Sequence, residues 1–292
     1  MTGIKVQGEK RMVLIAGRAH HELAEQVAEE LGIELLPTSA YDFANGEIYV
    51  RFEESIRGCD VFVLQAHPYP INKWLMEQLI MIDSAKRASA KRITIVSPFY
   101  PYARQDKKHR GREPISARLV SDLYKTAGAD RLMSVDLHTS QIQGFFDGPV
   151  DHLFALDLLI HHVKERWGDR DITVPNQAVS KQVVGQIEGR TCVLIDDMID
   201  TGGTIAGAVN VLKQAGARDV IIAATHAVFS DPASRRLAES GAREVIVTNS
   251  LPVPPEKRFP NLTVLSIAPL LARAIREVFD DGSVTTLFGG LS

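Results

Sequence analysis

Short runs of β-branched residues alternate with longer amphipathic stretches along the whole sequence. Apolar runs of about 4 to 8 residues are typical of buried strands, and stretches of about 12 residues with a helical period are typical of helices. Strands that alternate with helices form βαβ units, so we expect an α/β fold with mainly parallel sheets flanked by helices. The expected strands begin near residues 11, 61, 92, 131, 191, 219, 243 and 262.

The length of 292 residues indicates two domains, because a single hydrophobic core rarely grows beyond roughly 250 residues. The alternation supports a first domain at 1–150 and a second at 151–292. Gly128, Gly216 and Gly241 each follow a helical stretch and precede a strand, where a left-handed capping residue belongs. The sequence therefore predicts two tandem α/β domains.

One interval departs from this scheme. Between the helix that ends near residue 168 and the strand at 191–197, the sequence "RDITVPNQAVSKQVVGQIEG" is polar and predicts a loop or a short hairpin. We therefore expect the second domain to have fewer strands than the first and its sheet to lack a βαβ step.

Charge and composition exclude several classes of protein. The net charge of -3 and pI of 6.3 give no broad basic surface, so we expect no nucleic acid partner. No apolar run approaches the roughly 20 residues that span a bilayer, and the first residues lack the layout of a signal peptide; we expect no membrane partner and a cytoplasmic location. Cys59 and Cys192 border apolar runs without metal-ligand spacing, so we expect both to be reduced and buried.

The sequence "VLIDDMIDTGGTI" at 193–205 runs from an apolar strand through three carboxylates into a glycine-rich turn and a helix. We name residues 200–204 the phosphate turn, which consists of Asp200, Thr201, Gly202, Gly203 and Thr204. The backbone N–H groups of Thr201 to Thr204 are expected to converge at the helix N-terminus, where they and the helix dipole favour a phosphate. The alternative is an acidic helix cap and glycine turn without a ligand.

Asp196 and Asp197 stand just before the phosphate turn, at the carboxyl end of the expected strand, where parallel sheets bind ligands. Carboxylates there suit sugar hydroxyls or Mg²⁺, and they repel phosphate, so the ligand must have two different ends. This motif resembles the phosphoribosyl-pyrophosphate loop of the type I phosphoribosyltransferases. The resemblance implies that Asp196 and Asp197 hold the ribose 2- and 3-hydroxyls of ribose 5-phosphate, while the phosphate turn holds the 5-phosphate.

The sequence "PFYPYARQDKKHRGREPIS" at 98–116 is strongly basic. It contains Arg104, Lys107, Lys108, Arg110 and Arg112 around His109. Such density after a strand suits a polyphosphate, because arginine binds phosphate oxygens with two N–H groups and lysine acts as a point charge. An isolated charge run is more often a solvated loop, but a phosphate-binding candidate elsewhere in the chain favours the functional interpretation.

The sequence "DLHTSQIQGFFDGPVDHL" at 136–153 resembles the signature of the ribose-phosphate pyrophosphokinases, also called phosphoribosyl-pyrophosphate synthetases. The stretches "YDFANGEIYVRFEESIRGCD" at 41–60 and "YARQDKK" at 102–108 resemble that family's ATP-binding segments. The similarity runs from about residue 11 to the C-terminus. It implies two tandem phosphoribosyltransferase-like domains, and transfer of the diphosphate of ATP to the anomeric hydroxyl of ribose 5-phosphate, for nucleotide biosynthesis.

The resemblance also implies roles for single residues. Arg104 and Gln105 contact ATP, and His138 serves the Mg²⁺-ATP as a metal or phosphate contact. Phe43, Asn45 and Glu47 approach the adenine from a neighbouring subunit, which makes the protein a homo-oligomer, a hexamer by family precedent. The residues with implied catalytic roles are Lys107, Lys108 and Arg170.

The sequence departs from the family at one place. Roughly 30 residues, about one βαβ step, are absent between "KERWGD" and "RDITVPNQ". In the family this segment carries an aspartate and a lysine of the site, and we interpret Arg170 as the surviving partner of that lysine. An omission from the sequence, a true deletion and a noncatalytic regulatory subunit are the three explanations. A nucleobase phosphoribosyltransferase is a weaker alternative, because it explains neither the ATP segments nor the tandem layout.

Overall fold

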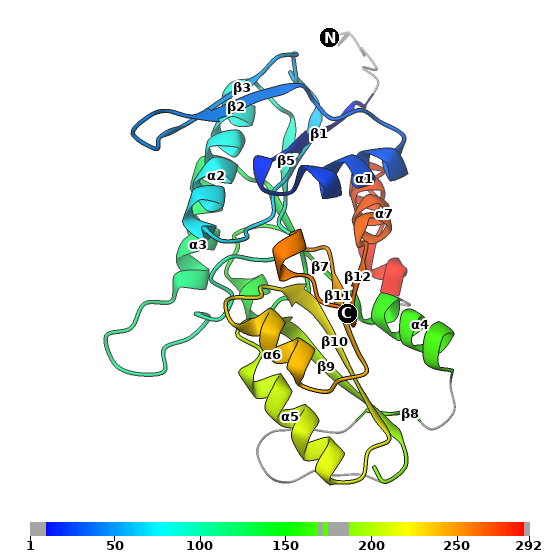
Figure 1. Ribbon diagram of the computed structural model, residues 1–292. Coiled ribbons are helices and arrows are strands. Elements are labelled where there is room, and N and C mark those ends of the chain that lie inside the picture. The colour runs from blue at the N-terminus through cyan, green and yellow to red at the C-terminus, as the bar shows by residue number, and fades with distance from the viewer. Residues whose placement is uncertain (1–9, 169–171, 175–186, 289–292) are drawn as a thin grey trace, which may run out of the picture.

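The computed structural model in Figure 1 describes residues 10–168, 172–174 and 187–288. Within those residues it contains two parallel five-stranded sheets and a separate two-stranded hairpin. Helices flank both sheets, which confirms the α/β fold predicted from the alternating pattern.

The first sheet has the strand order β1-β4-β5-β6-β7, and each described pair of neighbours is parallel. Its strands are β1 (Met12–Ala16), β4 (Asp60–Leu64), β5 (Arg92–Val96), β6 (Arg131–Val135) and β7 (Val150–Leu153). The connections contain η1 (Arg18–His20), α1 (His21–Leu31), α2 (Ile71–Arg87), α3 (Ser116–Ala127) and η2 (Ser140–Gly144). The central strand β4 is buried along its length, as a strand with helices on both faces must be.

Different helices cover the two faces of this sheet. Because successive strand residues point to opposite faces, Ile15 and Val63 pack with α2 and α3, whereas Leu14 and Phe62 pack with α1 and with α7 (Ala268–Phe279). The last long helix of the chain thus returns to the first sheet, and α1 and α7 lie side by side. A domain division at residue 150 stays a prediction.

The second sheet has the order β12-β11-β10-β9-β8. Its strands are β8 (Ile172–Thr173), β9 (Thr191–Ile199), β10 (Asp219–Ala227), β11 (Glu244–Thr248) and β12 (Leu262–Leu265). The accompanying helices are α4 (Leu156–Trp167), α5 (Gly203–Gln214), α6 (Ala233–Glu239) and η3 (Pro255–Lys257). The last short helix, η4 (Val284–Phe288), instead packs with α7 against the core of the first sheet.

Each sheet has five described strands, but the part of the chain up to Leu153 contains seven strands, including the hairpin, and the part after it contains five. The expectation of fewer strands in the second domain is therefore confirmed for the described residues. One strand of the second sheet, β8, consists of two residues of the polar interval and pairs with the start of β9. A segment this short carries no apolar periodicity, so the pattern of the sequence did not predict it.

The hairpin consists of β2 (Thr38–Asp42) and β3 (Ile48–Phe52), which pair antiparallel. It extends from the first sheet past the side of α2, as Figure 1 shows in blue. Val50 and Phe52 pack its base against the first hydrophobic core.

Both cysteines are free and buried, as predicted. In the described ranges, no helix combines the length and the apolar character that crossing a bilayer requires.

Candidate active site

The phosphate turn connects β9 to α5. Asp196 and Asp197 lie in the last part of β9, and α5 begins at Gly203. Gly202 caps the helix with a φ of 71°, a left-handed conformation that side chains with a Cβ adopt only at a cost. The first N–H groups of an α-helix have no helical acceptor, so the turn offers donors for an anion. That the turn binds a phosphate stays a prediction.

A hollow of about 310 Å³ contains this turn and lies where elements of the two sheets meet. Its lining consists of Arg104, His138 and the segment 196–205. All the ribose 5-phosphate residues predicted from the sequence therefore lie in one hollow, together with two of the residues predicted to serve ATP.

Two ion pairs cross this hollow. His138 follows β6 of the first sheet, and its Nδ1 lies 2.7 Å from Asp197 Oδ2. Arg104 follows β5, and its Nη1 lies 2.6 Å from Asp200 Oδ2. Basic groups from the first sheet thus meet acidic groups from the second, in a space that can hold a ligand with both phosphate and hydroxyl groups.

The carboxylates of the site differ in their proton affinity. Burial, followed by the neighbouring Asp197 carboxylate, raises the pKa of Asp196 to about 6. Burial also acts to raise the pKa of Asp200, but hydrogen bonds with Ser230 and Arg104 outweigh it and lower that pKa. A ligand cation or hydroxyl donor beside Asp196 would stabilise its charged form.

Sequence reasoning missed the residues that join the two sheets behind the site. His226 of β10 is buried, and its Nε2 lies 3.0 Å from the carbonyl oxygen of Val135, at the end of β6. Thr225 donates a hydrogen bond to Asp136 Oδ2 at 2.5 Å. These contacts hold the end of β6, and therefore His138, against the second sheet. The sequence did contain a signal for them, because Thr225 and His226 are polar residues within the apolar run "IIAATHAVF" and buried polar groups need partners.

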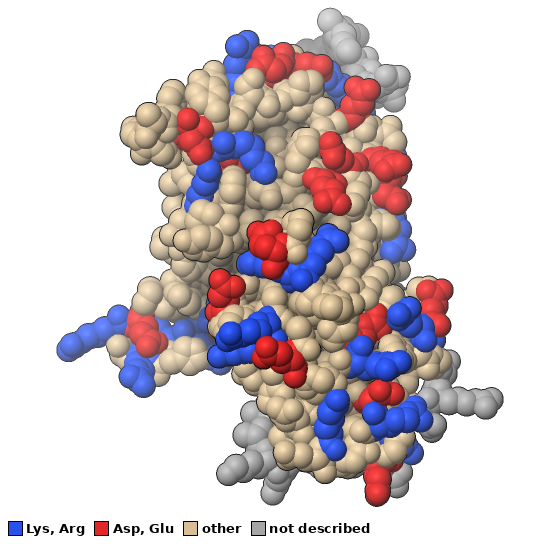
Figure 2. All heavy atoms as spheres, in the orientation of Figure 1, with Lys and Arg blue, Asp and Glu red and all other residues tan. Residues whose placement is uncertain are grey.

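The basic segment is anchored at both ends. Asp106 is buried and accepts hydrogen bonds from Thr139 and Gln141, and Glu113 accepts from the backbone N–H groups of His109 and Arg110. Between these anchors, residues 107–112, which we name the basic loop, are exposed. Figure 2 shows blue side chains projecting from the left side of the molecule, where the loop before α3 lies in Figure 1. Lys107 and Lys108 do not line the hollow in this conformation.

The residues predicted to approach adenine lie at the end of the hairpin. Residues 43–47, which we name the hairpin tip, contain Phe43, Asn45 and Glu47. Phe43 is 46% exposed, and none of the three lines the hollow. Tyr41 and Tyr49 stack at 4.7 Å beside the tip. The chain thus presents an exposed aromatic surface at a distance from its own phosphate turn.

Two predictions, the role of Arg170 and the metal site, are not supported by contacts between the described residues. Arg170 lies outside the described residues. The part of the chain that the structure describes contains no group of three or more His, Cys, Asp or Glu side chains arranged to hold a metal ion. Asp196 and Asp197 nevertheless supply the oxygen donors that Mg²⁺ prefers, and a substrate phosphate would complete such a site.

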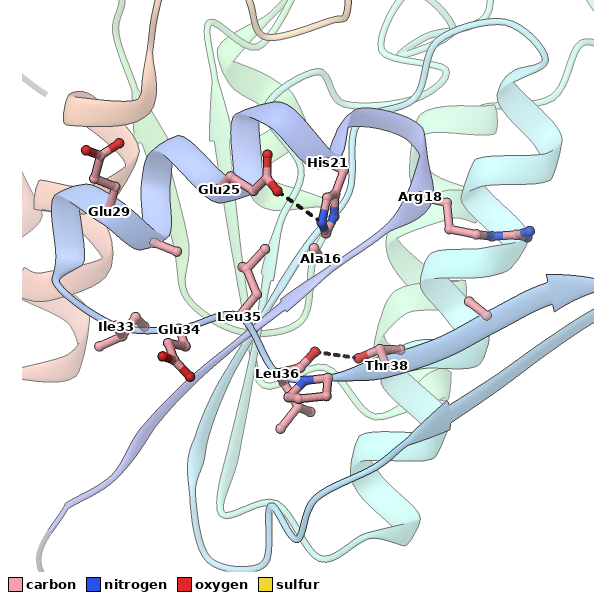
Figure 3. Close-up of a pocket in the computed structure, with 13 residues that line it drawn as sticks. Ala16, Arg18, His21, Glu25, Glu29, Ile33, Glu34, Leu35, Leu36 and Thr38 are labelled. Atoms are coloured by element: carbon pink, nitrogen blue, oxygen red, sulfur yellow. Dashed lines mark hydrogen bonds and ion pairs between the residues drawn. The ribbon is translucent and has the colours of Figure 1, made fainter.

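A larger hollow, of about 730 Å³, lies between α1 and the start of β2 (Figure 3). Its wall carries Glu25, Glu29 and Glu34, which outnumber the cation of Arg18, and it contains none of the residues of the phosphate turn. A negative rim is unsuited to a polyphosphate, so size alone does not identify the active site.

Two sequence profiles match the chain. The profile of the N-terminal domain of ribose phosphate pyrophosphokinase matches residues 12–128, and that of the phosphoribosyl synthetase-associated domain matches residues 164–289. Curated ribose-phosphate pyrophosphokinases are similar over nearly the whole chain: the protein of Mycobacterium leprae is 63% identical, and the alignment covers 96% of each chain. The chain belongs to the ribose-phosphate pyrophosphokinase family.

Further comparisons agree with this assignment. The ribose-phosphate pyrophosphokinase of Corynebacterium glutamicum is 60% identical, with 99% of each chain covered. The crystal structure of phosphoribosylpyrophosphate synthetase from Mycobacterium smegmatis superposes with a TM-score of 0.90 at 63% identity, covering 94% of this chain and 100% of that one. The family predicted from the three motifs is thereby confirmed.

The alignments also bear on the absent segment. They extend over 315 positions for the M. leprae protein and 324 for the C. glutamicum protein, more than the 292 residues of this chain. This chain therefore lacks residues that these relatives contain. Their location between the α4 segment and Arg170 stays a prediction.

Proposed function

We propose that the hollow between the two sheets binds ribose 5-phosphate and the polyphosphate of ATP together, and that the chain forms 5-phosphoribosyl 1-diphosphate and AMP there. The anomeric oxygen of ribose 5-phosphate attacks the β-phosphorus of ATP. A new phosphorus–oxygen bond forms, the bond from the β-phosphorus to the bridging α,β-oxygen breaks, AMP leaves with that oxygen, and the hydroxyl proton passes to solvent. The family membership makes the chain a diphosphotransferase, and the roles of its individual residues are proposed from the lining of the hollow.

One observation carries this proposal: the ion pairs of His138 with Asp197 and of Arg104 with Asp200. In each pair, a basic side chain suited to a polyphosphate lies within hydrogen-bonding distance of a carboxylate that belongs to the sugar-phosphate end of the hollow. An in-line transfer requires such proximity of the two substrates, because positioning supplies much of the rate in phosphoryl transfer.

The ribose end is assigned to the second sheet. Asp196 and Asp197 accept hydrogen bonds from the 2- and 3-hydroxyls, and Asp200, Thr201, Gly202, Gly203 and Thr204 bind the 5-phosphate through backbone N–H groups and hydroxyls. Arg236 supports this turn, because its Nη1 donates to the carbonyl oxygen of Thr201 at 3.1 Å.

The ATP end is assigned to the first sheet. Arg104 and Gln105 bind phosphate oxygens, and His138 orients the same group. Lys107 and Lys108 approach when the exposed basic loop closes, so that their charge stabilises the transferring group and water is excluded. Arg170 is proposed as a further cation for that group.

Mg²⁺ fits the donor set of Asp196, Asp197 and the substrate phosphates, and when bound it would neutralise charge on the phosphate oxygens.

We propose a homo-oligomer, a hexamer by family precedent, in which the hairpin tip of one subunit reaches the ATP of its neighbour. Light scattering after size exclusion measures this state. We also propose that the protein is located in the cytoplasm.

A noncatalytic subunit remains the second candidate because the chain is shorter than its aligned relatives. Binding measurements separate the assignments from this alternative and from misfolding. Asp197→Ala should remove ribose 5-phosphate binding and leave ATP binding nearly intact, whereas Arg104→Ala should do the reverse. Equal loss of both ligands in either variant, or unchanged binding, contradicts the proposed roles.

A further inference from the structure

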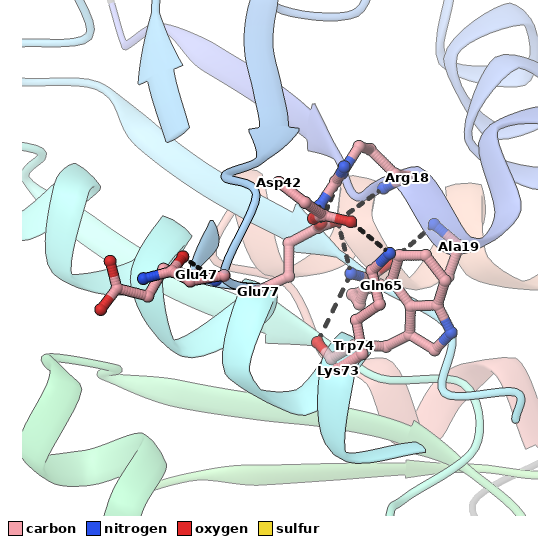
Figure 4. A network of polar contacts seen from close by, with 9 residues as sticks. Arg18, Ala19, Asp42, Glu47, Gln65, Lys73, Trp74 and Glu77 are labelled. Atoms are coloured by element: carbon pink, nitrogen blue, oxygen red, sulfur yellow. Dashed lines mark hydrogen bonds and ion pairs between the residues drawn. The ribbon is translucent and has the colours of Figure 1, made fainter. Parts of the chain in front are cut away.

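A network of charged side chains joins the hairpin to the body of the first sheet (Figure 4). None of its residues lines the hollow that contains the phosphate turn. The Arg18 guanidinium lies between two carboxylates, with Nη2 at 2.6 Å from Asp42 Oδ1 and Nε at 2.6 Å from Glu77 Oε2. Lys73 Nζ contacts the other oxygen of Asp42 at 2.6 Å. Arg18 belongs to η1, Asp42 ends β2, and Lys73 and Glu77 belong to α2.

The Glu77 end of this network is rigid. The Glu77 side chain is 0% exposed, and its Oε1 accepts hydrogen bonds from the Arg18 backbone N–H at 2.8 Å and from Gln65 Nε2 at 2.9 Å. A buried carboxylate is stable only with charged and hydrogen-bonding partners, so Glu77 fixes the Arg18 side chain in place. The Nη2 that contacts Asp42 also lies 2.5 Å from Glu77 Oε2, so the position of the guanidinium against Glu77 sets its contact with Asp42.

Asp42 directly precedes the hairpin tip, since Phe43 follows it in the sequence. The described hydrogen bonds of the tip itself are local: Phe43 N–H donates to the Glu47 carbonyl at 2.7 Å, and Glu47 N–H donates to Asn45 Oδ1 at 3.1 Å. Asp42 therefore supplies described ion pairs that join this end of the hairpin to η1 and α2.

We infer that Arg18 and Lys73 are positioning residues that act through Asp42 to fix the hairpin tip in the orientation that receives the adenosine part of ATP. The inference rests on the proposed function, because it requires that the tip contributes to an ATP site. Arg18 can set the direction of the tip because its planar guanidinium binds two carboxylates in fixed geometry, which a point charge does not do. Lys73 restrains the second oxygen of Asp42 and thus its rotation.

The test is the substitution Asp42→Asn, which keeps the size of the side chain and leaves the buried Arg18–Glu77 pair intact. Lys73→Met is the second variant and removes the other half of the contact. For both, we expect the KM for ATP to rise about tenfold, with kcat and the KM for ribose 5-phosphate within about twofold of the wild type. Glu53→Gln is the matched control, since Glu53 pairs with Arg51 on the same hairpin but at its base, and it should leave all three constants unchanged.

Unchanged constants in Asp42→Asn and Lys73→Met overturn the inference. So does an equal rise in both KM values together with a lower melting temperature, because that result describes general destabilisation. A wild-type chain that binds no ATP contradicts the proposed function itself, so the two failures are distinguishable.

A spectroscopic readout follows from the neighbouring Trp74. Lys73 Nζ lies 4.8 Å from the centre of its ring, and Arg18 lies 6.0 Å from it. The chain has two tryptophans, Trp74 and Trp167, so Trp167→Phe leaves Trp74 as the sole reporter. We expect Asp42→Asn to shift its emission in the absence of ligand, whereas Glu53→Gln should not. Identical spectra for the two variants contradict a contact that orients this part of the hairpin.

Discussion

The phosphate turn and the basic loop both present groups suited to phosphate, but they are built differently. The phosphate turn is part of the backbone between β9 and α5, and the left-handed Gly202 fixes its direction. The basic loop, residues 107–112, consists of long charged side chains that project into solvent from anchors at Asp106 and Glu113.

This difference in construction indicates that the two substrates are bound in different ways. A turn of backbone N–H groups binds one phosphate without reorganisation, because its donors are already in place. Long lysine and arginine side chains lose conformational entropy when they bind, so the basic loop is suited to contacts that form late, when the site closes. We therefore expect substitutions in the turn region to affect ribose 5-phosphate affinity and substitutions in the loop to affect turnover.

Asp197→Ala should have the largest effect. It removes a charged hydrogen-bond acceptor and leaves His138 without its partner, so kcat/KM for ribose 5-phosphate should fall on the order of 10²-fold. Steady-state kinetics with ribose 5-phosphate as the varied substrate measures this. The control is Asp219→Ala, at the opposite end of the second sheet, which should change the value little; equal losses in the two variants would contradict a local role.

The double variant Lys107→Ala and Lys108→Ala should come next. Turnover should fall by about tenfold or more, with little change in the dissociation constant of ATP, if both side chains act only in the closed state. Lys91→Ala removes an exposed lysine outside the loop and serves as the control. A weaker ATP affinity with unchanged turnover would instead make the basic loop a docking surface.

A buried histidine that follows β4, His67, predicts a dependence of stability on pH. Burial lowers the pKa of His67 to about 4, and its Nδ1 lies 3.2 Å from the Phe99 carbonyl oxygen. Since the unfolded histidine titrates near about 6.5, the unfolded state binds the extra proton first, and stability is lost as pH falls from about 6.5 toward 4.

Urea unfolding at about pH 7 and pH 5 should therefore show a loss of about 2 kcal/mol in the wild type that His67→Gln does not share. The diagnostic quantity is the difference in the free energy of unfolding between the wild type and His67→Gln, because the other ionisable groups affect both proteins alike. A difference that stays constant with pH would mean that His67 is not buried in its neutral form.

Gly202→Ala should have the smallest effect. At a φ of 71° an added Cβ costs about 1–2 kcal/mol of stability, and ribose 5-phosphate affinity should fall with it. Gly207→Ala is the matched control: it lies exposed within α5, nothing lies within 4 Å of the added Cβ, and it should stabilise the helix slightly. Equal effects of the two substitutions on stability would contradict the strained cap.

Much of the fold follows from the sequence because strands such as β4 and β10 are continuous apolar runs and their helices carry a clear period. The two-residue β8 and the return of α7 to the first sheet do not follow, since pairing of so short a strand and packing between distant segments leave no local pattern.

Prediction of the site from the sequence is limited in the same way, because contacts between distant residues leave no local pattern. The motif of the phosphate turn predicted a phosphate-binding backbone, and Asp196 and Asp197 lie beside it as expected. The pairing of Arg104 with Asp200 was not predicted, because 96 positions separate the two residues. The network around Arg18 and the buried His226 were missed for the same reason: their partners are distant in sequence, and their importance depends on burial.

The most direct test of the account is AMP release by a purified chain whose intact mass equals 32.1 kDa. We predict AMP from ATP only when ribose 5-phosphate and Mg²⁺ are both present, with one 5-phosphoribosyl 1-diphosphate formed for each AMP. A folded chain of that mass that binds both substrates but releases no AMP would contradict the account and favour the noncatalytic subunit.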